Sequence, residues 1–239
     1  MKKDHRWNTD HYESYTSELN REELYKLYPS ESWALYRTVQ DSKSVIDLGC
    51  GNGAMSSIIY KINKNAKYVG IDHQENLINK ANKKYKHAKF ISKDVISFVR
   101  ENKKKYDIVM AWSVIKSISK WKYLIKKMIE DSKKYVIFDQ RVANVNFVSF
   151  DEKILYANYG GKTGPLLCIN YKLLKEFLLQ QKNDLKKIEL MAYESRWGKN
   201  VKFNSKKNTF VTTVVLHKKI KKSDEFEGIY EQLPQNMER

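Results

Sequence analysis

The sequence predicts an α/β fold, in which helices cover both faces of a largely parallel sheet. From about residue 41 to 217, short apolar runs alternate with segments whose apolar residues recur every three or four positions. This alternation is typical of strands that are each followed by an amphipathic helix. The strand-like runs are apolar throughout, as expected of strands that are buried on both faces. Together these two observations favour a doubly wound sheet.

Five strands follow one another along the chain, and we expect them at residues 44–48, 67–72, 89–92, 106–111 and 134–139. Apolar residues at helical spacing mark the helix after each of the first four strands: Met55, Ile58, Ile59 and Ile62; Leu77, Ile78, Ala81 and Tyr85; Ile96 and Val99; Trp121, Leu124, Ile125 and Met128. Right-handed crossovers would place these helices on the two faces of the sheet.

The pattern changes after Asp139. Asn170 is a good N-cap for a helix that buries Leu173, Leu174, Phe177 and Leu178. Two strands follow at 187–193 and 209–217, and no helical pattern fits between them. We therefore expect an antiparallel hairpin, which brings the sheet to seven strands, most of them parallel.

Two segments, residues 1–40 and 218–239, flank this 41–217 core, and a third, residues 141–169, is an insertion within it; together they form a single expected domain over residues 1–239. Residues 1–40 are rich in aromatic side chains, and Asn20 and Glu23 could form a capping box for a helix that Pro29 ends. Residues 141–169 are far longer than a usual connection, and we expect them to cover the substrate. Residues 149–152 there resemble another capping box. Residues 218–239 are expected to be a mobile polar tail.

Composition excludes several classes of protein. With 239 residues, of which 41% are hydrophobic and 31% charged, the chain can fill a core. Two cysteines exclude a disulfide scaffold and a cysteine-built zinc site, and we expect no metal. No apolar run reaches the roughly 18 residues that span a bilayer, and the first ten residues lead into no signal core. We therefore expect a cytoplasmic protein without a membrane partner.

The net charge of +17 favours polyanionic partners. However, 38 of the 45 basic residues are lysines, scattered over nearly every polar helix face. Lysine attracts phosphate but lacks the planar fork with which arginine reads bases. We interpret the charge as a lysine-rich composition rather than a dedicated nucleic-acid surface.

A glycine-rich turn carries most of the chemical information. Gly49, Gly51 and Gly53 follow the strand at 44–48 and precede a helix, so the backbone there can approach a ligand closely. Asp72 ends the next strand, 21 residues after Gly51. A carboxylate at that spacing can accept hydrogen bonds from both hydroxyls of a ribose. The pattern therefore predicts a nucleotide-like ligand.

Two kinds of nucleotide fit this geometry. A dinucleotide motif has the spacing Gly-x-Gly-x-x-Gly, but here the third glycine comes one residue early. Asp47 also lies two residues before Gly49, where a carboxylate would repel a pyrophosphate. A carboxylate in that place suits a ligand that carries an ammonium and a sulfonium.

The stretch VIDLGCGNG (45–53) resembles the glycine-rich motif of class I S-adenosylmethionine (SAM)-dependent methyltransferases, and the resemblance covers roughly residues 41–139. It implies a Rossmann-like fold and SAM as the cofactor, with S-adenosylhomocysteine (SAH) as its product. By this resemblance Asp47 anchors the methionyl end, the glycines line the cofactor, and Asp72 holds the ribose. The remaining residues implied in the site are Cys50 in the glycine turn, His73 beside the adenosine, Asp94 and Val95 at the adenine, and Ala111, Trp112 and Ser113 facing cofactor and acceptor.

The sequence departs from the family in two respects. The paired histidines that many small-molecule members carry after the fourth strand are absent from residues 113–117, which puts a histidine-based role there in doubt. The Asn-Pro-Pro-aromatic motif of adenine N6 and glutamine methylases is also missing. Its absence argues against those amino-group chemistries.

Aromatic residues of the N-terminal segment, Trp7 and Tyr15 among them, are candidates for a lid over the cofactor, because aromatic faces attract a sulfonium. His11 and Asp139 are candidate catalytic residues that could take the acceptor's proton. Asp139 ends the fifth strand, at the edge of the sheet where ligands of open α/β folds bind.

These observations predict methyl transfer to a hydroxyl or amine of a small anionic metabolite, such as a sugar, a sugar-nucleotide or a phosphorylated precursor. Residues 141–169 would select that acceptor. Three alternatives stay open: an RNA methyltransferase, a methyltransferase-like subunit without turnover, and a nicotinamide-dependent oxidoreductase on the same fold. The oligomeric state is not predicted by the sequence.

Overall fold

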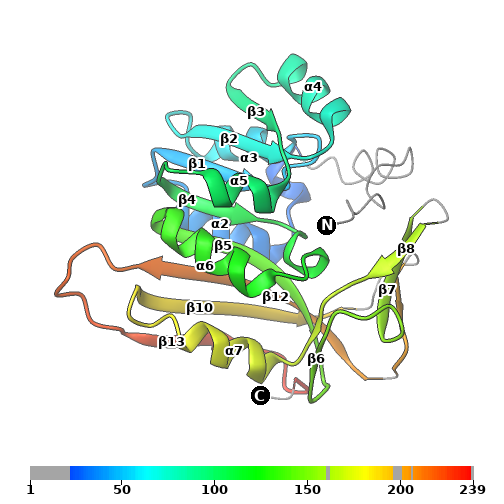
Figure 1. The fold of residues 1–239 in the computed structure, drawn as a ribbon. Helices are drawn as coiled ribbons and strands as arrows, with labels where there is room; N and C mark the ends of the chain where they lie inside the picture. Colours follow the sequence, from blue (N-terminus) through cyan, green and yellow to red (C-terminus); the bar gives the residue numbers. More distant parts are fainter. Residues whose placement is uncertain (1–21, 160–161, 196–200, 206, 238–239) are drawn as a thin grey trace.

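The central sheet of the protein has eight strands in the order β13-β10-β12-β5-β4-β1-β2-β3 (Figure 1). The computed structural model describes residues 22–159, 162–195, 201–205 and 207–237. The eight strands are β1 (Ser44–Leu48), β2 (Lys67–Asp72), β3 (Ala88–Ser92), β4 (Tyr106–Ala111), β5 (Ser132–Ala143), β10 (Leu185–Glu194), β12 (Thr209–Lys218) and β13 (Gly228–Gln232). Of these eight, β12 alone runs antiparallel to its neighbours. The α/β fold class and the mostly parallel sheet are therefore confirmed.

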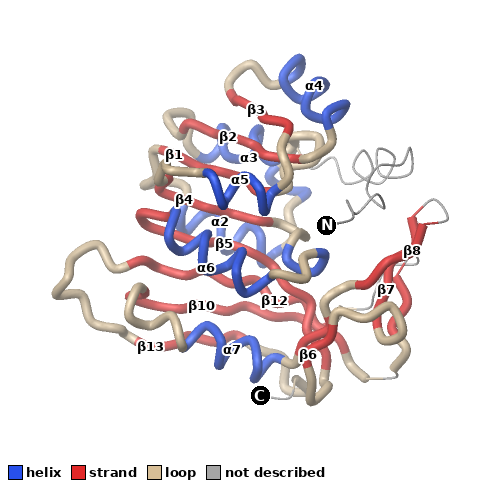
Figure 2. Tube along the Cα trace, viewed as in Figure 1, coloured by secondary structure: helices blue, strands red, loops and turns tan. Residues whose placement is uncertain are grey.

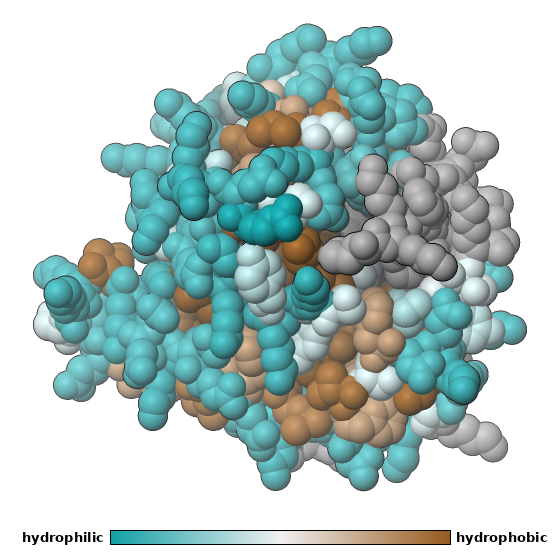
Figure 3. Space-filling model, in the orientation of Figure 1, coloured by the Kyte–Doolittle hydropathy of each residue, from teal (hydrophilic) through white to brown (hydrophobic). Residues whose placement is uncertain are grey.

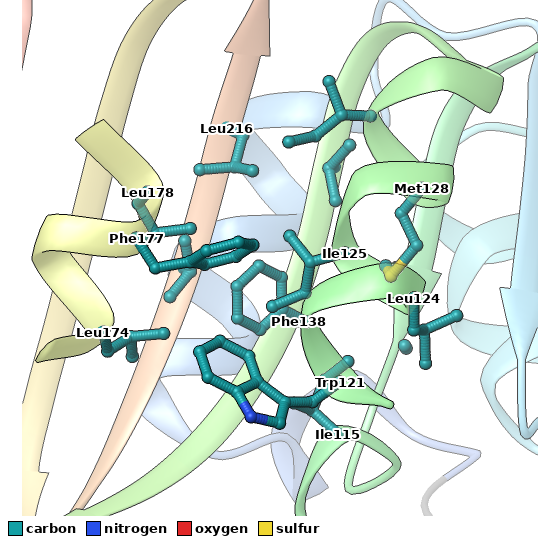
Figure 4. Packing of buried hydrophobic residues seen from close by; sticks show 14 of the residues in the cluster. Ile115, Trp121, Leu124, Ile125, Met128, Phe138, Leu174, Phe177, Leu178 and Leu216 are labelled. Carbon is teal, nitrogen blue, oxygen red and sulfur yellow. The ribbon is translucent and has the colours of Figure 1, made fainter. Parts of the chain in front are cut away.

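Helices cover both faces of this sheet (Figure 2). One face packs against α2 (Pro29–Thr38), α3 (Met55–Ile62) and α4 (Glu75–Lys84), and the other against α5 (Val95–Glu101), α6 (Trp121–Asp131) and α7 (Tyr171–Leu179). Two short 3-10 helices, η2 (Leu24–Lys26) and η3 (Ile115–Ser117), complete the helical elements of the described residues. On the α6 and α7 face, the rings of Trp121 and Phe177 meet edge to face with centroids 4.9 Å apart (Figure 4).

The strand order creates a switch point between β1 and β4. From β1 the chain builds outward through β2 to β3, and from β4 it builds outward in the opposite direction through β5. In open α/β sheets, the crevice at the carboxyl ends of such a strand pair is where ligands bind. The glycine turn after β1 and the segment after β4 both lie at this edge.

The predicted antiparallel hairpin is present: β10 and β12 pair antiparallel, and β12 lies between β10 and β5. Strand β5 extends to Ala143, beyond the predicted end at Asp139, because it pairs with nearly the whole length of β12. The carboxyl end of β5 thus reaches past that of β4, whose last residue, Ala111, lies opposite Phe138.

The expectation of a mobile tail at 218–239 is wrong for part of that segment. Residues 228–232 form β13, which pairs parallel with β10 and gives the sheet its eighth strand. Phe226, Ile229 and Leu233 pack against the core, and Met237 is buried. The Glu231 carboxylate accepts hydrogen bonds from the Tyr171 hydroxyl and the Lys175 ammonium. A few apolar residues in a polar segment are enough to hold it on the edge of the sheet.

Residues 141–169, which we call the cover, form strands rather than a helix. The cover contains β6 (Val148–Ser149), β7 (Leu155–Tyr159), β8 (Lys162–Pro165) and β9 (Cys168–Ile169), and β7 also pairs with β11 (Val201–Phe203). The capping-box pattern at 149–152 fails because Asp151 makes a turn instead: its carboxylate accepts the Lys153 N–H and its carbonyl the Ile154 N–H. Figure 1 shows β7 and β8 projecting beyond the edge at which β4 and β5 end.

Pro29 begins a helix rather than ending one. It is the first residue of α2, where the lack of a proline N–H costs nothing. The Glu31 carboxylate accepts the Tyr28 N–H at 2.9 Å and so caps this helix. The expected partner Asn20 lies outside the described residues.

Hydrophilic side chains cover most of the face of the molecule seen in Figure 3, and the hydrophobic ones that show there gather mainly toward its lower part. In the part of the chain that the structure describes, no helix combines the length and the apolar character needed to cross a bilayer.

Candidate functional site

The glycine turn joins β1 to α3 at the carboxyl edge of the sheet. Gly49, Gly51 and Gly53 all have left-handed backbones, with φ of 81°, 56° and 79°. The N–H groups of Gly49 and Cys50 both donate to the Ile71 carbonyl, at 2.7 and 3.0 Å. These bonds tie the turn to β2, so its remaining backbone is presented at the switch point.

Two of these positions have no room for a side chain. A Cβ at Gly49 would lie 2.4 Å from Cγ2 of Val114, and one at Gly53 would lie 2.6 Å from the Phe90 ring. Because real Cβ contacts are not that short, both positions require glycine for space as well as for conformation.

Asp72, at the end of β2, supports the turn from the side. Its carboxylate accepts the Gly51 N–H and the Gln74 N–H, both at 2.9 Å, and is 2% exposed. His73 Nδ1 lies 3.4 Å from the same carboxylate. Asp72 therefore links the glycine turn to the start of α4. Each carboxylate oxygen has a second lone pair, so the group can still accept hydrogen bonds from a diol.

Asp47 is the most perturbed acid of this edge. Its side chain is 3% exposed, and Oδ2 accepts the Tyr68 hydroxyl at 2.5 Å. Oδ1 is buried and has no hydrogen-bond partner in the described structure. Burial raises the pKa of Asp47 to about 7; the Tyr68 hydrogen bond opposes this rise and the charge of Asp72 adds to it.

A buried carboxylate oxygen without a partner is costly unless a cation or donor completes it. The ammonium of a methionyl group would supply both the charge and the N–H donors. The chemistry at Asp47 therefore fits the cofactor that the sequence resemblance implies.

Asp94 is the N-cap residue of α5. Its carboxylate is exposed and accepts the Ser97 N–H at 2.8 Å, so it caps α5, and Val95 beside it is buried. The Lys93 N–H donates to the Asp72 carbonyl at 2.8 Å, which brings the start of α5 next to the end of β2. Contact with an adenine stays a prediction.

The segment after β4, residues 112–117, closes the other side of the edge. Ala111 is buried, and the indole N–H of Trp112 is buried without a hydrogen-bond partner among the described residues. Ser113 has a left-handed backbone with φ of 57°. Its N–H donates to the Asp139 carboxylate, so this candidate proton acceptor already receives a hydrogen bond from the protein.

A second polar group lies farther along β5. Arg141 follows Asp139 by two residues and so lies on the same face, where its Nη1 donates to the Ser195 hydroxyl at 3.2 Å. Burial raises the pKa of Tyr193, while the Arg141 charge opposes the rise; Glu31 is also close enough to raise it. The Tyr193 phenol is consequently protonated at neutral pH and can donate.

Sequence reasoning missed Tyr68, Val114, Arg141 and Tyr193, because their places depend on strand register and on the path of the chain after β4. The predicted site residues Trp7, His11 and Tyr15 lie outside the described residues. Asp47, Asp72 and the three glycines lie together at the carboxyl edge of the sheet, and their contact with a cofactor stays a prediction.

Comparison with known proteins gives a consistent result. A family model described as "Methyltransferase domain" matches residues 40–159, which is half of the chain. A putative methyltransferase of Invertebrate iridescent virus 6 is 29% identical over 149 residues, covering 56% of this chain and 54% of the viral protein. A trans-aconitate 2-methyltransferase of Yersinia pestis is 27% identical over 89 residues, covering 37% of this chain and 32% of that protein. The matched stretches thus span about half or less of these relatives.

Solved structures share the fold at low identity. The plantazolicin methyltransferase BpumL, in complex with SAH and a pentazolic desmethylPZN analogue, aligns with a TM-score of 0.58 and 14% identity over 90% of this chain and 94% of BpumL. The N-terminal domain of EvdMO1 with SAH bound aligns with a TM-score of 0.58 and 12% identity, over 80% of this chain and 82% of that one. These similarities show a common fold.

Proposed function

The chain belongs to the methyltransferase domain family, and from that premise we propose that residues 1–239 form one SAM-dependent methyltransferase domain. The observation that carries the proposal is the buried Asp47 Oδ1 without a partner, beside a glycine turn that is fixed by Asp72. Asp47 lies on β1, at the switch point of the sheet, and Asp72 ends the neighbouring strand β2. The SAH-bound structural neighbours support the same cofactor.

SAM would supply an activated methyl group on a sulfonium. Asp47 would hold the ammonium of the methionyl end, and Asp72 the ribose hydroxyls. Asp94 and Val95 would contact the adenine, with Cys50 and His73 nearby, while Ala111 and Trp112 would face the transferred group. The main task of the protein is alignment, since holding the acceptor in line can supply several kcal/mol of the barrier. His11 is our candidate for taking the acceptor's proton, and Trp7 and Tyr15 for closing the site.

For the acceptor we propose a small molecule with an anionic group. Arg141 on β5, Tyr193 on β10 and Ser195 just after β10 present a guanidinium and two hydroxyls near the carboxyl end of β5, and this set of donors suits a carboxylate or phosphate. The name of the trans-aconitate 2-methyltransferases indicates an organic acid as their acceptor, which supports this class. The cover, which lies past the same edge, would select among such acids.

The net charge of +17 favours RNA as the competing acceptor. A labelled-methyl assay separates the two: purified protein is incubated with labelled SAM and either trans-aconitate, fractionated metabolites or total RNA. We expect label in an acidic small-molecule fraction. Label in RNA alone would assign the competing acceptor.

The cofactor is tested separately by thermal unfolding with SAH and with NAD. A ligand that binds only the folded state raises the melting temperature. We expect SAH to raise it and NAD to leave it unchanged. A rise with NAD alone would identify an oxidoreductase, and no rise with either would refute the proposed cofactor.

A further inference from the structure

The segment after β4, residues 112–117, contacts two distant parts of the chain. On one side, Val114 packs directly on Gly49 of the glycine turn, where its Cγ2 occupies the place of a missing Cβ. On the other side, the Lys116 carbonyl accepts the Leu167 N–H of the cover at 2.7 Å. The same short segment therefore lies between the proposed cofactor turn and the proposed acceptor cover.

The conformation of this segment depends on Ser113. A left-handed backbone, with φ of 57°, is unfavourable for any residue with a Cβ other than asparagine or aspartate. Serine takes it only where the surroundings stabilise it. The Asp139 carboxylate accepts the Ser113 N–H and so supplies that stabilisation.

The cover is also fastened to β5 next to Asp139. Gln140 Nε2 donates to the Arg141 carbonyl at 2.6 Å and to the Leu167 carbonyl at 3.5 Å. Leu167 thus contacts β5 through its carbonyl and the segment after β4 through its N–H. A change in the backbone at Ser113 would move one of these two attachments relative to the other.

We propose that Asp139 is a positioning residue. By accepting the Ser113 N–H it holds the segment after β4 in its left-handed conformation, which keeps Val114 on the glycine turn and Lys116 on the cover. Asp139 thereby fixes the position of the glycine turn relative to the cover. The geometric part stands on the contacts above, whereas its consequence for SAM rests on the proposed function.

Two measurements test this role. The exchange rate of the Leu167 amide, followed by NMR in the protein without ligand, reports the attachment of the cover. The affinity for SAH, measured by titration calorimetry, reports the glycine turn. The variants are Asp139→Ala, Asp139→Asn, Ser113→Gly and the double variant Asp139→Ala/Ser113→Gly.

Asp107 offers a matched control. Its carboxylate accepts the Lys43 N–H at 2.7 Å, which is the same kind of bond, but at the start of β4 and so at the opposite edge of the sheet. Asp107→Ala should lower the melting temperature while changing neither the Leu167 exchange rate nor the SAH affinity by more than about twofold.

We expect Asp139→Ala to accelerate exchange at Leu167 and to weaken SAH binding, each about tenfold. Asp139→Asn should recover most of both losses, because its amide oxygen accepts the same N–H. Ser113→Gly alone should change the Leu167 exchange rate and the SAH affinity little, because the segment of the wild-type protein is already in place. In the Asp139→Ala background, the same substitution should slow exchange at Leu167 and strengthen SAH binding, each at least threefold. Apparent affinity scales with the competent population, so relief of the strain matters only when that population is low.

The proposal is overturned if Asp139→Ala leaves the Leu167 exchange rate unchanged, or if Ser113→Gly recovers nothing in the double variant. It is also overturned if Asp139→Asn is as impaired in turnover as Asp139→Ala, with a shifted pH profile, since that result would mark a proton acceptor. If Asp139→Ala does not fold, Asp139→Ser takes its place. If the wild-type protein binds no SAH, the proposed function fails, and the Leu167 exchange rate still decides the role of Asp139.

Discussion

Replacing Asp47 with asparagine should make the protein more stable at alkaline pH while it weakens cofactor binding. The Asp47 carboxyl is buried, and burial is the main cause of the rise in its pKa from 3.8 to about 7. An acid whose pKa is raised by folding is protonated more readily in the folded than in the unfolded state. Stability therefore falls as the pH rises from about 4 to 7, and it stays low above pH 7.

The size of this loss follows from the two pKa values. The difference between 3.8 and about 7, at roughly 1.4 kcal/mol for each pH unit, gives about 4 kcal/mol for holding the charged group above pH 7. Asparagine has no charge and keeps an oxygen that accepts the Tyr68 hydroxyl. Its NH2 group would be buried without an acceptor, at a cost of about 1–3 kcal/mol. The free energy of unfolding of Asp47→Asn should therefore exceed that of the wild type by about 2 kcal/mol at pH 8.5.

Urea unfolding of the wild type and of Asp47→Asn at pH 5 and pH 8.5 measures this gain directly. The comparison of the two proteins cancels the contribution of the other titrating groups. We expect the advantage of the variant to be clear at pH 8.5 and much smaller or reversed at pH 5. Equal or lower stability of Asp47→Asn at pH 8.5 would refute the reasoning.

The same variant should lose SAH affinity by at least about 30-fold, because removal of one partner of a buried charge pair costs about 2–5 kcal/mol. Binding to the wild type should strengthen as the pH rises through about 7, since the ammonium needs the ionised carboxylate. Titration calorimetry at pH 6 and pH 8 measures both effects. A variant that is stabilised and still binds SAH tightly would remove Asp47 from the site.

Three further predictions concern other parts of the fold. Gly49→Ala should destabilise the protein by at least about 1 kcal/mol more than Gly228→Ala. Both glycines have positive φ, but of the two only Gly49 has other atoms where a Cβ would lie. Thermal unfolding of the two variants measures the difference, and equal losses of stability would contradict the clash at Gly49. Met237→Ala should lower the free energy of unfolding in urea by about 2 kcal/mol, since this methionine is 4% exposed. An unchanged free energy of unfolding would contradict the packing of Met237 and support the mobile tail expected from the sequence. The His217 hydrogen bond is the main cause of the lowered pKa of Glu189. The stability that the Glu189 carboxylate contributes is therefore present above the ordinary glutamate pKa and is lost as the pH falls through the lowered value. Glu189→Gln should cost more at pH 7 than at pH 3 in urea unfolding, and an equal cost at both would exclude a contribution from the charge of Glu189.

The sequence was sufficient to predict β1, β2 and β4 within their observed bounds, because a strand that is buried on both faces leaves an uninterrupted apolar run. It was not sufficient for β13. That strand lies at an edge, and its apolar contacts amount to a few residues in a charged segment. In the cover, the capping-box pattern competed with a turn at Asp151, and the turn forms. Local patterns of similar strength are decided by tertiary pairing.

The site shows the same division. Asp47 and Asp72 could be placed at one edge, because the carboxyl ends of parallel strands meet there. Their partners could not be predicted, since the Tyr68 hydroxyl reaches Asp47 only in one strand register. Asp139 was predicted as a candidate catalytic residue at the end of the fifth strand. The hydrogen bond that Asp139 accepts from the Ser113 N–H depends on the left-handed backbone of Ser113. That conformation cannot be predicted from a serine in the sequence.

The position of β12 has a consequence for biosynthesis. This strand lies between β5 and β10 but follows both in the chain. While a ribosome adds residues 195–218, at about 5–20 residues per second, β5 has an open edge and β10 has no partner between itself and the rest of the sheet. Open apolar edges pair readily with other chains. The nascent protein therefore exposes these edges for about 1–5 seconds while β12 is synthesised, and chaperones that bind extended apolar segments would act on it at that stage.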